Sequence, residues 1–584
     1  MTSSSFVDQP LAVPLWSLKS VRFRIAILIA LAMTIQAMIR NNLNMALVCM
    51  VPIDEIAPSS LNSTKSADLC GREPLNTSFP QQVIPPSYVT RYQVDWSMSE
   101  QGRIHSAYYV GSLMSVFVAS QLTDRFGGKN LITVGVVINS LGTLLTPLVA
   151  ILFARYEIIV VLRFIMGFAQ GFLVPCGSLI LAKWFTVHEK STAMAIFTTG
   201  NQVGLALAMF STAQLCQVYN TDVVDGNCVA PAPRSHMKSL FVRPHFSFQV
   251  DFIGGWPSAF ILSSVVALLF LLVWIPFASD RPRDSKYITA AELEHINGQT
   301  VKHRAMSISV STPYTKILLC PVVLAICLCS FCQSFVMVSL ATYLPQYNQS
   351  ALKLDISSNG LWASVPFMVQ MVTKFIFAFV ADHLKKRHVS VNLVTKCCNS
   401  VASFLGAICI IWISFLGCGD YVLVLSLLCI SMGIFSGYVP GYNTSIVSVA
   451  PIFTAHISAY AQFYAQLAST IAPALIGIMT NDDSTNGWST VFYMLAGVLI
   501  ASGVFFQLFG SATVVPWAIP EELHIPKNDR SSARLVPLNQ EQTEMDFLAL
   551  PRTTKRTPKV SIMEDDLEGD RETLRSASNE DSHD

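Results

Sequence analysis

The stretch that decides the fold reads Asp124-Arg125-Phe126-Gly127-Gly128-Lys129, a charged turn directly after a long apolar segment. A weaker copy, Asp382-His383-Leu384-Lys385-Lys386-Arg387, follows another long apolar segment in the second half of the chain. A second pair of related stretches, Phe185-Thr186-Val187-His188 and Phe453-Thr454-Ala455-His456, recurs at nearly the same offset. Because similar turns return in the same order, the sequence predicts two related halves.

Apolar runs on either side of these turns are long enough to cross a bilayer. Hydrophobic residues make up 52% of the 584-residue chain and charged residues only 13%, whereas a soluble domain carries about 25% charged residues. A helix needs roughly 20 apolar residues to span the hydrocarbon core. We therefore predict an all-α polytopic membrane protein with twelve transmembrane helices in two pseudo-symmetric six-helix bundles. The predicted spans are 24–51, 101–123, 130–152, 157–182, 191–216, 256–279, 316–345, 358–381, 392–416, 421–449, 456–480 and 488–510.

Charged and polar breaks between the runs give the domain organisation. The last part is rich in Ser, Glu, Asp and Arg, a composition typical of a disordered tail. The predicted parts are a cytoplasmic N-terminal tail at 1–23, a first bundle at 24–279 with an outer loop at 52–100, a cytoplasmic linker at 280–315, a second bundle at 316–510 and a cytoplasmic tail at 511–584.

Two independent patterns place both termini in the cytoplasm. Most basic residues of the short loops fall on the predicted inner face, as the positive-inside rule requires. Glycosylation sequons at Asn62, Asn76 and Asn348 fall in loops that this orientation places outside. Cys70 and Cys228 lie in polar outer loops and could form a disulfide. The sequence leaves open whether the membrane is the plasma membrane or an endolysosomal or vesicular membrane.

Composition also narrows the class of function. The net charge of +1 gives no electrostatic reason to bind nucleic acid. The predicted spans contain no nucleophile–base pair and no metal-ligand cluster, so we expect no enzyme activity, no bound metal and no cofactor other than a coupling ion, Na⁺ or H⁺. The expected partners are therefore the lipid bilayer and a small substrate, handled by a monomeric transport unit.

Two arginines inside predicted spans indicate the sign of the substrate. None of the 37 acidic residues lies in the apolar interior of a span, whereas Arg40 and Arg163 do. Burying an arginine at mid-bilayer costs about 2.5–3.5 kcal/mol, and a guanidinium binds carboxylate or phosphate through two parallel hydrogen bonds. We therefore predict that both arginines bind an anion. Asn44 lies one turn after Arg40 on the same helix face and is expected to line the same site.

Other charged and titratable residues leave alternatives open. His105, one turn into the second span, is expected at the substrate-binding site, where it could carry a proton or gate the substrate; the alternative is a hydrogen-bonded structural histidine. Lys374 is expected to extend its ammonium to the cytoplasmic side. The charged residues of the repeated turns are expected to gate transport by pairing between helices, with a purely topogenic role as the alternative. They are Asp124, Arg125, Lys129, Asp382 and Lys385.

The charged turn, its copy and the twelve spans resemble the major facilitator superfamily. Over roughly residues 24–510, the chain more narrowly resembles the anion–cation symporter family, which includes sodium–phosphate cotransporters, sialin and the vesicular glutamate transporters. The resemblance implies that Arg40 and Arg163 are substrate-linked arginines and that His105 is the family's span-two histidine. The stretches that carry it are Met38 to Val48, Trp96 to Ser112, Arg163 to Gly171 and Gly200 to Gly204.

The chain also departs from parts of that family. Where sialin and the vesicular glutamate transporters carry a span-four glutamate, this chain has Gln170, and the span-seven arginine of the glutamate transporters is Gln333 here. Both glutamines are expected to contact the substrate. The span-four pattern is most similar to the phosphate-cotransporter branch, so the resemblance implies that coupling through a buried carboxylate is disfavoured.

These observations predict a secondary active transporter that carries a small anion by alternating access. The substrate is expected to be inorganic phosphate or an organic anion, with sodium symport or membrane potential as the driving force. The alternatives are a vesicular or lysosomal proton-linked transporter of sialate or an acidic amino acid, and an anion channel. The duplicated turns argue against the channel.

Overall fold

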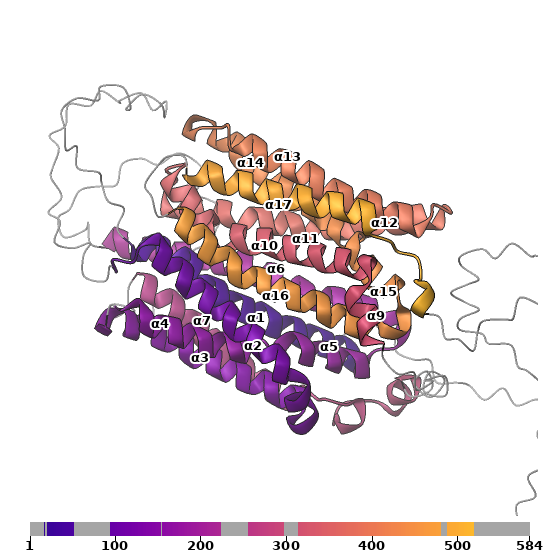
Figure 1. Ribbon diagram of the computed structural model, residues 1–584. Coiled ribbons are helices and arrows are strands. Elements are labelled where there is room, and N and C mark those ends of the chain that lie inside the picture. The colour runs from indigo at the N-terminus through magenta and orange to yellow at the C-terminus, as the bar shows by residue number, and fades with distance from the viewer. Residues whose placement is uncertain are drawn as a thin grey trace, which may run out of the picture. The chain divides into compact units, whose positions relative to one another are not determined.

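The computed structural model describes residues 17, 20–51, 94–153, 155–222, 255–296, 313–480 and 487–518. Within these ranges the chain is helical and contains no strand. The long helices run side by side as one bundle of rods (Figure 1). Asn62, Asn76, Cys70, Cys228 and the tail beyond Ala518 lie outside the described residues, so the features expected there stay predictions.

The first half of the chain forms six long rods that match the predicted spans. A capping box, in which Ser97 and Glu100 satisfy each other's backbone groups, fixes the start of the second rod. The fourth rod is interrupted at Gly171 and Phe172 and therefore consists of two helices. The helices are α1 (Val21–Met50), α2 (Met98–Phe126), α3 (Gly128–Phe153), α4 (Tyr156–Gln170) with α5 (Leu173–Trp184), α6 (Val187–Asp222) and α7 (Trp256–Phe277).

The second half repeats this plan, including the interruption of its fourth rod. There the helix tightens to a 3₁₀ turn at Ser436–Tyr438 before it resumes. A π-helical turn at Val401–Leu405 interrupts the third rod. After the short α9 (Tyr314–Leu319), the helices are α10 (Pro321–Ser350), α11 (Ile356–Lys386), α12 (Val391–Ser400) with α13 (Gly406–Ile413), α14 (Tyr421–Phe435) with α15 (Tyr442–Ser448), α16 (Thr454–Met479) and α17 (Gly487–Phe509).

Ten of the described rods are both long enough and apolar enough to cross a membrane. The other two, α2 and α16, contain 29 and 26 residues and are more polar. They pack against each other: a side chain at Gly102 would lie 2.6 Å from Pro473 O, and one at Gly477 would lie 2.6 Å from Met98 O. Because α2 and α16 face each other across the two halves, they need less apolar surface than helices surrounded by lipid.

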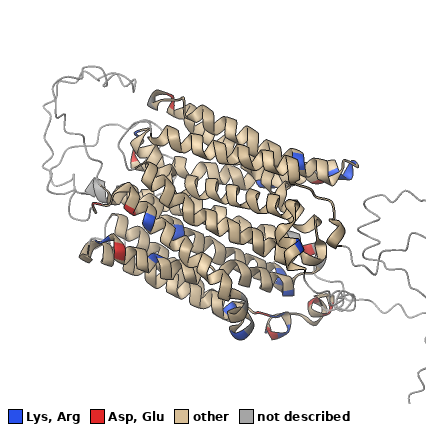
Figure 2. Cartoon of the chain, in the orientation of Figure 1, with Lys and Arg blue, Asp and Glu red and all other residues tan. Residues whose placement is uncertain are grey.

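Charge is distributed as a membrane requires. Lys, Arg, Asp and Glu gather toward the two ends of the helices and leave the middle of the bundle largely uncharged (Figure 2). Many large apolar side chains, such as Leu272, Phe379 and Phe415, are exposed along the outside of the bundle. In water such a surface would be unfavourable, whereas lipid covers it without cost.

Asn348 is fully buried near the end of α10, and its Nδ2 donates to Asn359 Oδ1 at 3.1 Å. A glycan needs an asparagine that projects into solvent. The prediction that Asn348 is glycosylated is therefore wrong for the folded chain, because α10 continues to Ser350 and packs this side chain against α11.

The first repeated turn is anchored to the end of α7. Lys129 N donates to Asp280 Oδ1 at 2.7 Å, and Lys129 Nζ donates to Ile275 O at 2.7 Å. The Asp280 carboxylate fills the space beside Gly127, whose φ of +81° favours glycine. Lys129 thus ties α3 to α7 within the first half.

The second repeated turn behaves differently. Asp382 and Lys385 lie 3.6 Å apart on one turn of α11, so this pair does not join two helices as expected. Arg125 is exposed and stacks its guanidinium near Phe126, with 5.4 Å to the ring centre. The side chain of Asp124 lies outside the described residues. The gating role of these residues stays a prediction.

Candidate functional site

A small polar cavity lies where the two halves meet, well inside the bundle. It has about 10 Å³ of space for the centre of a water molecule, roughly enough for one water. A phosphate or a carboxylate would therefore need the surrounding helices to move apart. Residues of α1, α2, α4 and α10 line the cavity: Arg40, Asn41, Asn44, His105, Tyr108, Tyr109, Arg163 and Thr342.

Close packing of α2 on α4 brings two of the predicted site residues together. A side chain at Gly167 would lie 1.8 Å from Tyr108 O, and one at Gly111 would lie 2.1 Å from Phe164 O. Only glycine allows the two backbones to approach so closely. The contact places Arg163 of α4 beside His105 of α2 at the cavity wall.

Arg163 is a buried cation whose charge has no anionic partner among the residues that the structure describes. Its side chain is only 2% exposed, and neither its Nε nor its Nη2 has a hydrogen-bond partner. The ion pairs found among the described residues involve Arg22 and Lys385 and do not include Arg163. Because a buried donor without a partner is costly, the arginine is suited to an acceptor that enters the cavity.

Arg40 approaches the same cavity from α1. Its Nη2 donates to Asn201 Oδ1 of α6 at 2.7 Å, whereas its Nε has no partner. A neutral amide orients the guanidinium but does not cancel its charge. Arg40 therefore keeps both a positive charge and a free donor for a ligand.

Asn44 and His105, both expected at the substrate-binding site, also line this cavity. Asn44 Nδ2 donates to Ala341 O at 2.8 Å, a contact between α1 and α10. The His105 ring meets the Tyr343 ring edge-on, with 6.4 Å between the ring centres. Asn44 thus joins the two halves at the cavity, and His105 lies between Arg163 and the aromatic side chains of α10.

Gln170 and Gln333 do not line the cavity, although both were expected to contact the substrate. Gln170 is buried further along α4, and its Oε1 has no partner. Gln333 Oε1 accepts a hydrogen bond from the Tyr442 hydroxyl. In this conformation neither glutamine shares a wall with the two arginines.

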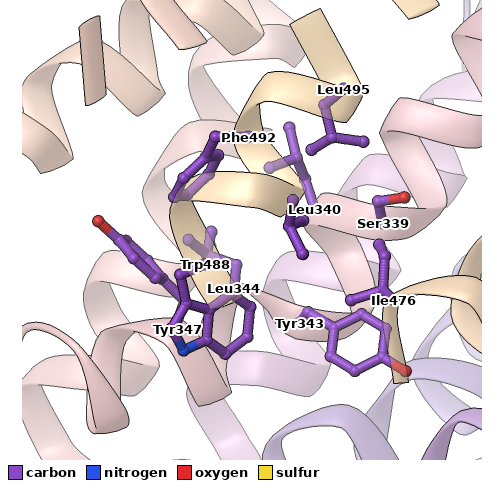
Figure 3. Close-up of a pocket in the computed structure, with 10 residues that line it drawn as sticks. Ser339, Leu340, Tyr343, Leu344, Tyr347, Ile476, Trp488, Phe492 and Leu495 are labelled. Carbon is purple, nitrogen blue, oxygen red and sulfur yellow. The ribbon is translucent and has the colours of Figure 1, made fainter. Parts of the chain in front are cut away.

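A second cavity lies among α10, α16 and α17 (Figure 3). The volume open to the centre of a water molecule is about 20 Å³. Aliphatic and aromatic side chains, including Leu340, Trp488 and Phe492, make up most of the wall. Tyr343 borders it, and its hydroxyl donates to Pro473 O at 2.7 Å. No charged side chain lines this cavity, so it is unsuited to an anion.

Several site features were not found from the sequence. Tyr108, Tyr109 and Thr342 also line the cavity, and no charge within an apolar run marks them in the sequence. A disulfide joins Cys49 at the end of α1 to Cys216 on α6, whereas the sequence suggested only Cys70 with Cys228. Cys49 and Cys216 each end a predicted span at the same face, and that signal could have identified them.

Comparison with known proteins agrees with this fold. A sequence model of the Major Facilitator Superfamily matches residues 29–473. The chain is 25% identical over 505 residues to the "Putative inorganic phosphate cotransporter" of Drosophila melanogaster, covering 86% of this chain and 87% of that protein. It is 24% identical over 504 residues to sialin of Homo sapiens, covering 86% and 91%.

The fold also matches solved transporters. The xylose transporter XylE from E. coli, in a partially occluded inward-open conformation, superposes with a TM-score of 0.55 at 13% identity, covering 84% of this chain and 99% of that one. An identity this low shows likeness of fold alone. By its repeated halves, its helical bundle and the extent of these matches, the chain belongs to the major facilitator superfamily and resembles its anion–cation symporters.

Proposed function

We propose that this transporter carries a small anion, inorganic phosphate or an organic anion, through the cavity that holds Arg40 and Arg163. The observation that supports this most is the pair of guanidinium groups in one cavity, Arg163 buried and Arg40 half-buried, with no ion-pair partner for either among the described residues. A dianion or carboxylate can bind both forks at once. The bound anion would pair both guanidinium charges and so offset the free-energy cost of placing them in the protein interior without a partner.

Contacts between the halves support alternating access. Several of them lie toward the face where α1 and α10 end, which is the predicted outer face. Gln349 Nε2 donates to Val48 O at 3.3 Å, and a side chain at Gly360 would lie 2.1 Å from Ala213 Cβ. These contacts thus cover the cavity on that side. An anion can enter from the predicted outer face only in another state, in which the contacts have opened.

The Cys49–Cys216 disulfide lies at this same face. Disulfides form in oxidising compartments outside the cytosol. The pair therefore supports an orientation in which α1 ends at an extracellular or lumenal face and the N-terminus is cytoplasmic. It does not discriminate between the plasma membrane and a vesicular membrane.

Transport could be driven in two ways, by sodium or membrane potential, or by protons. Sodium or membrane potential would suffice without a titratable group, since moving one charge across 100 mV provides about 2.3 kcal/mol. A proton-linked cycle of the vesicular or lysosomal kind is favoured by one observation, the position of His105 in the cavity wall with Arg163. A protonated histidine there would add a third positive charge to the anion site.

Uptake of radiolabelled phosphate, urate, sialate and glutamate into proteoliposomes tests the proposal, with sodium, pH and potential varied independently. We expect saturable uptake of at least one anion, with stimulation by the same anion on the opposite side. Uptake that does not saturate and shows no such stimulation would indicate a channel. Absence of uptake for every anion would contradict the proposed function.

A further inference from the structure

Lys374 is a basic residue deep inside the second half. It lies roughly 18 Å along α11 from the predicted cytoplasmic end of that helix. Its Nζ lies 3.1 Å from Gln202 Oε1 on α6, with the Gln202 amide placed so that its nitrogen donates to Thr198 O at 2.7 Å. The expectation that Lys374 extends to the cytoplasmic side is therefore wrong, because its ammonium turns across the boundary between the halves.

The ammonium of Lys374 is positively charged and incompletely paired. An ammonium group has three donors, and the contact with Gln202 uses one of them. Lys374 belongs to none of the ion pairs among the described residues. The side chain is half-buried. Because an incompletely paired charge within a membrane helix is unfavourable, an anionic ligand would stabilise this ammonium.

One segment of α6 holds this lysine and the central site side by side. Asn201 accepts a hydrogen bond from Arg40, and its neighbour Gln202 accepts one from Lys374. Gly200 and Gly204 bring this segment close to α1, where added side chains would lie 2.3 Å from Ala30 O and 2.1 Å from Thr34 O. The backbone that carries both amides is therefore packed tightly against α1.

The depth of Lys374 differs from that of Arg163. Both α4 and α11 begin at the predicted outer face. Arg163 lies roughly 10 Å along its helix and Lys374 roughly 27 Å along its own. Lys374 is therefore nearer to the predicted cytoplasmic face than Arg163, with Arg40 reaching Asn201 between them.

We propose that Lys374 and Gln202 form a second binding position for the transported anion, between the central arginines and the predicted cytoplasmic face. An anion that leaves Arg40 and Arg163 meets the ammonium of Lys374 next, without passing through uncompensated hydrocarbon. The ligand class is the phosphate or carboxylate of the proposed function, on which this inference rests. Binding of the anion from the Lys374 side of the transporter would then depend on this lysine.

The test compares Lys374→Met with wild type in proteoliposomes of known orientation, supplied with the transported anion from each side in turn. We expect the KM for anion supplied at the Lys374 side to rise roughly tenfold, the effect of losing one charge-assisted hydrogen bond, with the KM at the opposite side within twofold of wild type. Lys374→Arg keeps the charge and should stay within about threefold on both sides. Lys396→Met is the matched control, because Lys396 is half-buried on α12 and donates to Gln507 O at 2.9 Å, away from α6.

The KM values on the two sides distinguish a role for Lys374 in anion binding from the alternatives. An equal KM for Lys374→Met and wild type at the Lys374 side would overturn it and leave the proposed anion transport standing. An equal rise of the KM on both sides would also overturn it, since Lys374 would then act through the central site. If wild-type protein transports no anion while it is folded and monodisperse, the proposed function and this inference fail together.

Discussion

Arg163 is the residue whose replacement tests the central site most directly. Lysine at this position keeps the charge but loses the planar fork that holds an anion with two hydrogen bonds. A charge-assisted hydrogen bond contributes about 1.5–3 kcal/mol, and about 1.4 kcal/mol corresponds to a factor of ten. We expect Arg163→Lys to raise the KM for the anion at least roughly tenfold, and Arg163→Gln to abolish saturable uptake. Concentration-dependent uptake into proteoliposomes measures both.

Arg103 provides the control for this prediction. It is exposed on α2, where its Nη1 donates to the Tyr156 hydroxyl at 3.0 Å. Arg103→Gln should therefore transport as wild type does. Wild-type uptake by Arg163→Gln would show instead that the buried guanidinium is structural and that the anion binds elsewhere.

The sequence was a good guide to the charged residues of the site and a poor guide to their neighbours. Arg40, Arg163, Asn44 and His105 were predicted and line one cavity, because a charge within an apolar run is visible without a structure. Gln170 follows Arg163 by two helical turns and so lies about 10 Å further along the same face. Periodicity identifies a face but not a depth, and the depth depends on how α2 and α4 pack.

The start of α1 is fixed by a distant part of the chain. The linker residue Glu292 accepts hydrogen bonds from Ser20 Oγ at 2.7 Å, from Val21 N at 3.2 Å and from Arg22 N at 3.1 Å. Arg22 also pairs with Glu189 at the start of α6, at 2.6 Å. One carboxylate thus caps α1 and ties the linker to the first half.

The pKa of Glu292 makes this cap dependent on pH. Burial alone would raise its pKa, but the hydrogen bonds from Ser20, Arg22 and Val21 outweigh burial and lower it. The cap therefore stabilises the fold fully above the ordinary glutamate value of about pH 4.3, and this stability is lost as the pH falls through the lower pKa of the folded state. We expect Glu292→Gln to lower the apparent Tm in detergent by a few degrees at neutral pH, as loss of a cap worth roughly 1–2 kcal/mol implies.

The pH dependence separates this role from a general effect of mutation. Between about pH 5 and pH 3, the Tm difference between wild type and Glu292→Gln should shrink. Glu294→Gln, an exposed change on the same linker segment, should match wild type throughout. A Tm difference that stays constant over this range would contradict a contribution from the ionised carboxylate.

Hydropathy predicted the rods but not their interruptions. The spans that were predicted from apolar runs correspond to α1 through α17, including the polar pair α2 and α16. The breaks at Gly171 and at Ser436–Tyr438 were not predicted, because they change backbone hydrogen bonding without changing how apolar the segment is. Both breaks fall in the fourth rod of a half, so the repeat that is weak in sequence is clearer in structure.

At the scale of the whole molecule, alternating access depends on separation of the two halves at the contacts that join them in this structure. The repeated turns predicted two halves, but no sequence pattern predicted which face would be closed. That depends on the contacts between the halves, where α2 packs against α16 and α6 packs against α11. Gln214 of α6, for example, donates to Ser357 Oγ of α11 at 3.4 Å.

A disulfide across this contact should stop transport if the halves must separate there. We expect oxidised Gln214→Cys/Ser357→Cys to lose at least roughly nine-tenths of its uptake, because a covalent link between facing side chains prevents the opening that alternating access requires. Dithiothreitol should restore the uptake. Each single variant should transport as wild type does, and wild type treated with dithiothreitol controls for reduction of the Cys49–Cys216 bond. Full uptake by protein shown to be cross-linked would mean that the substrate path opens without separation of α6 from α11.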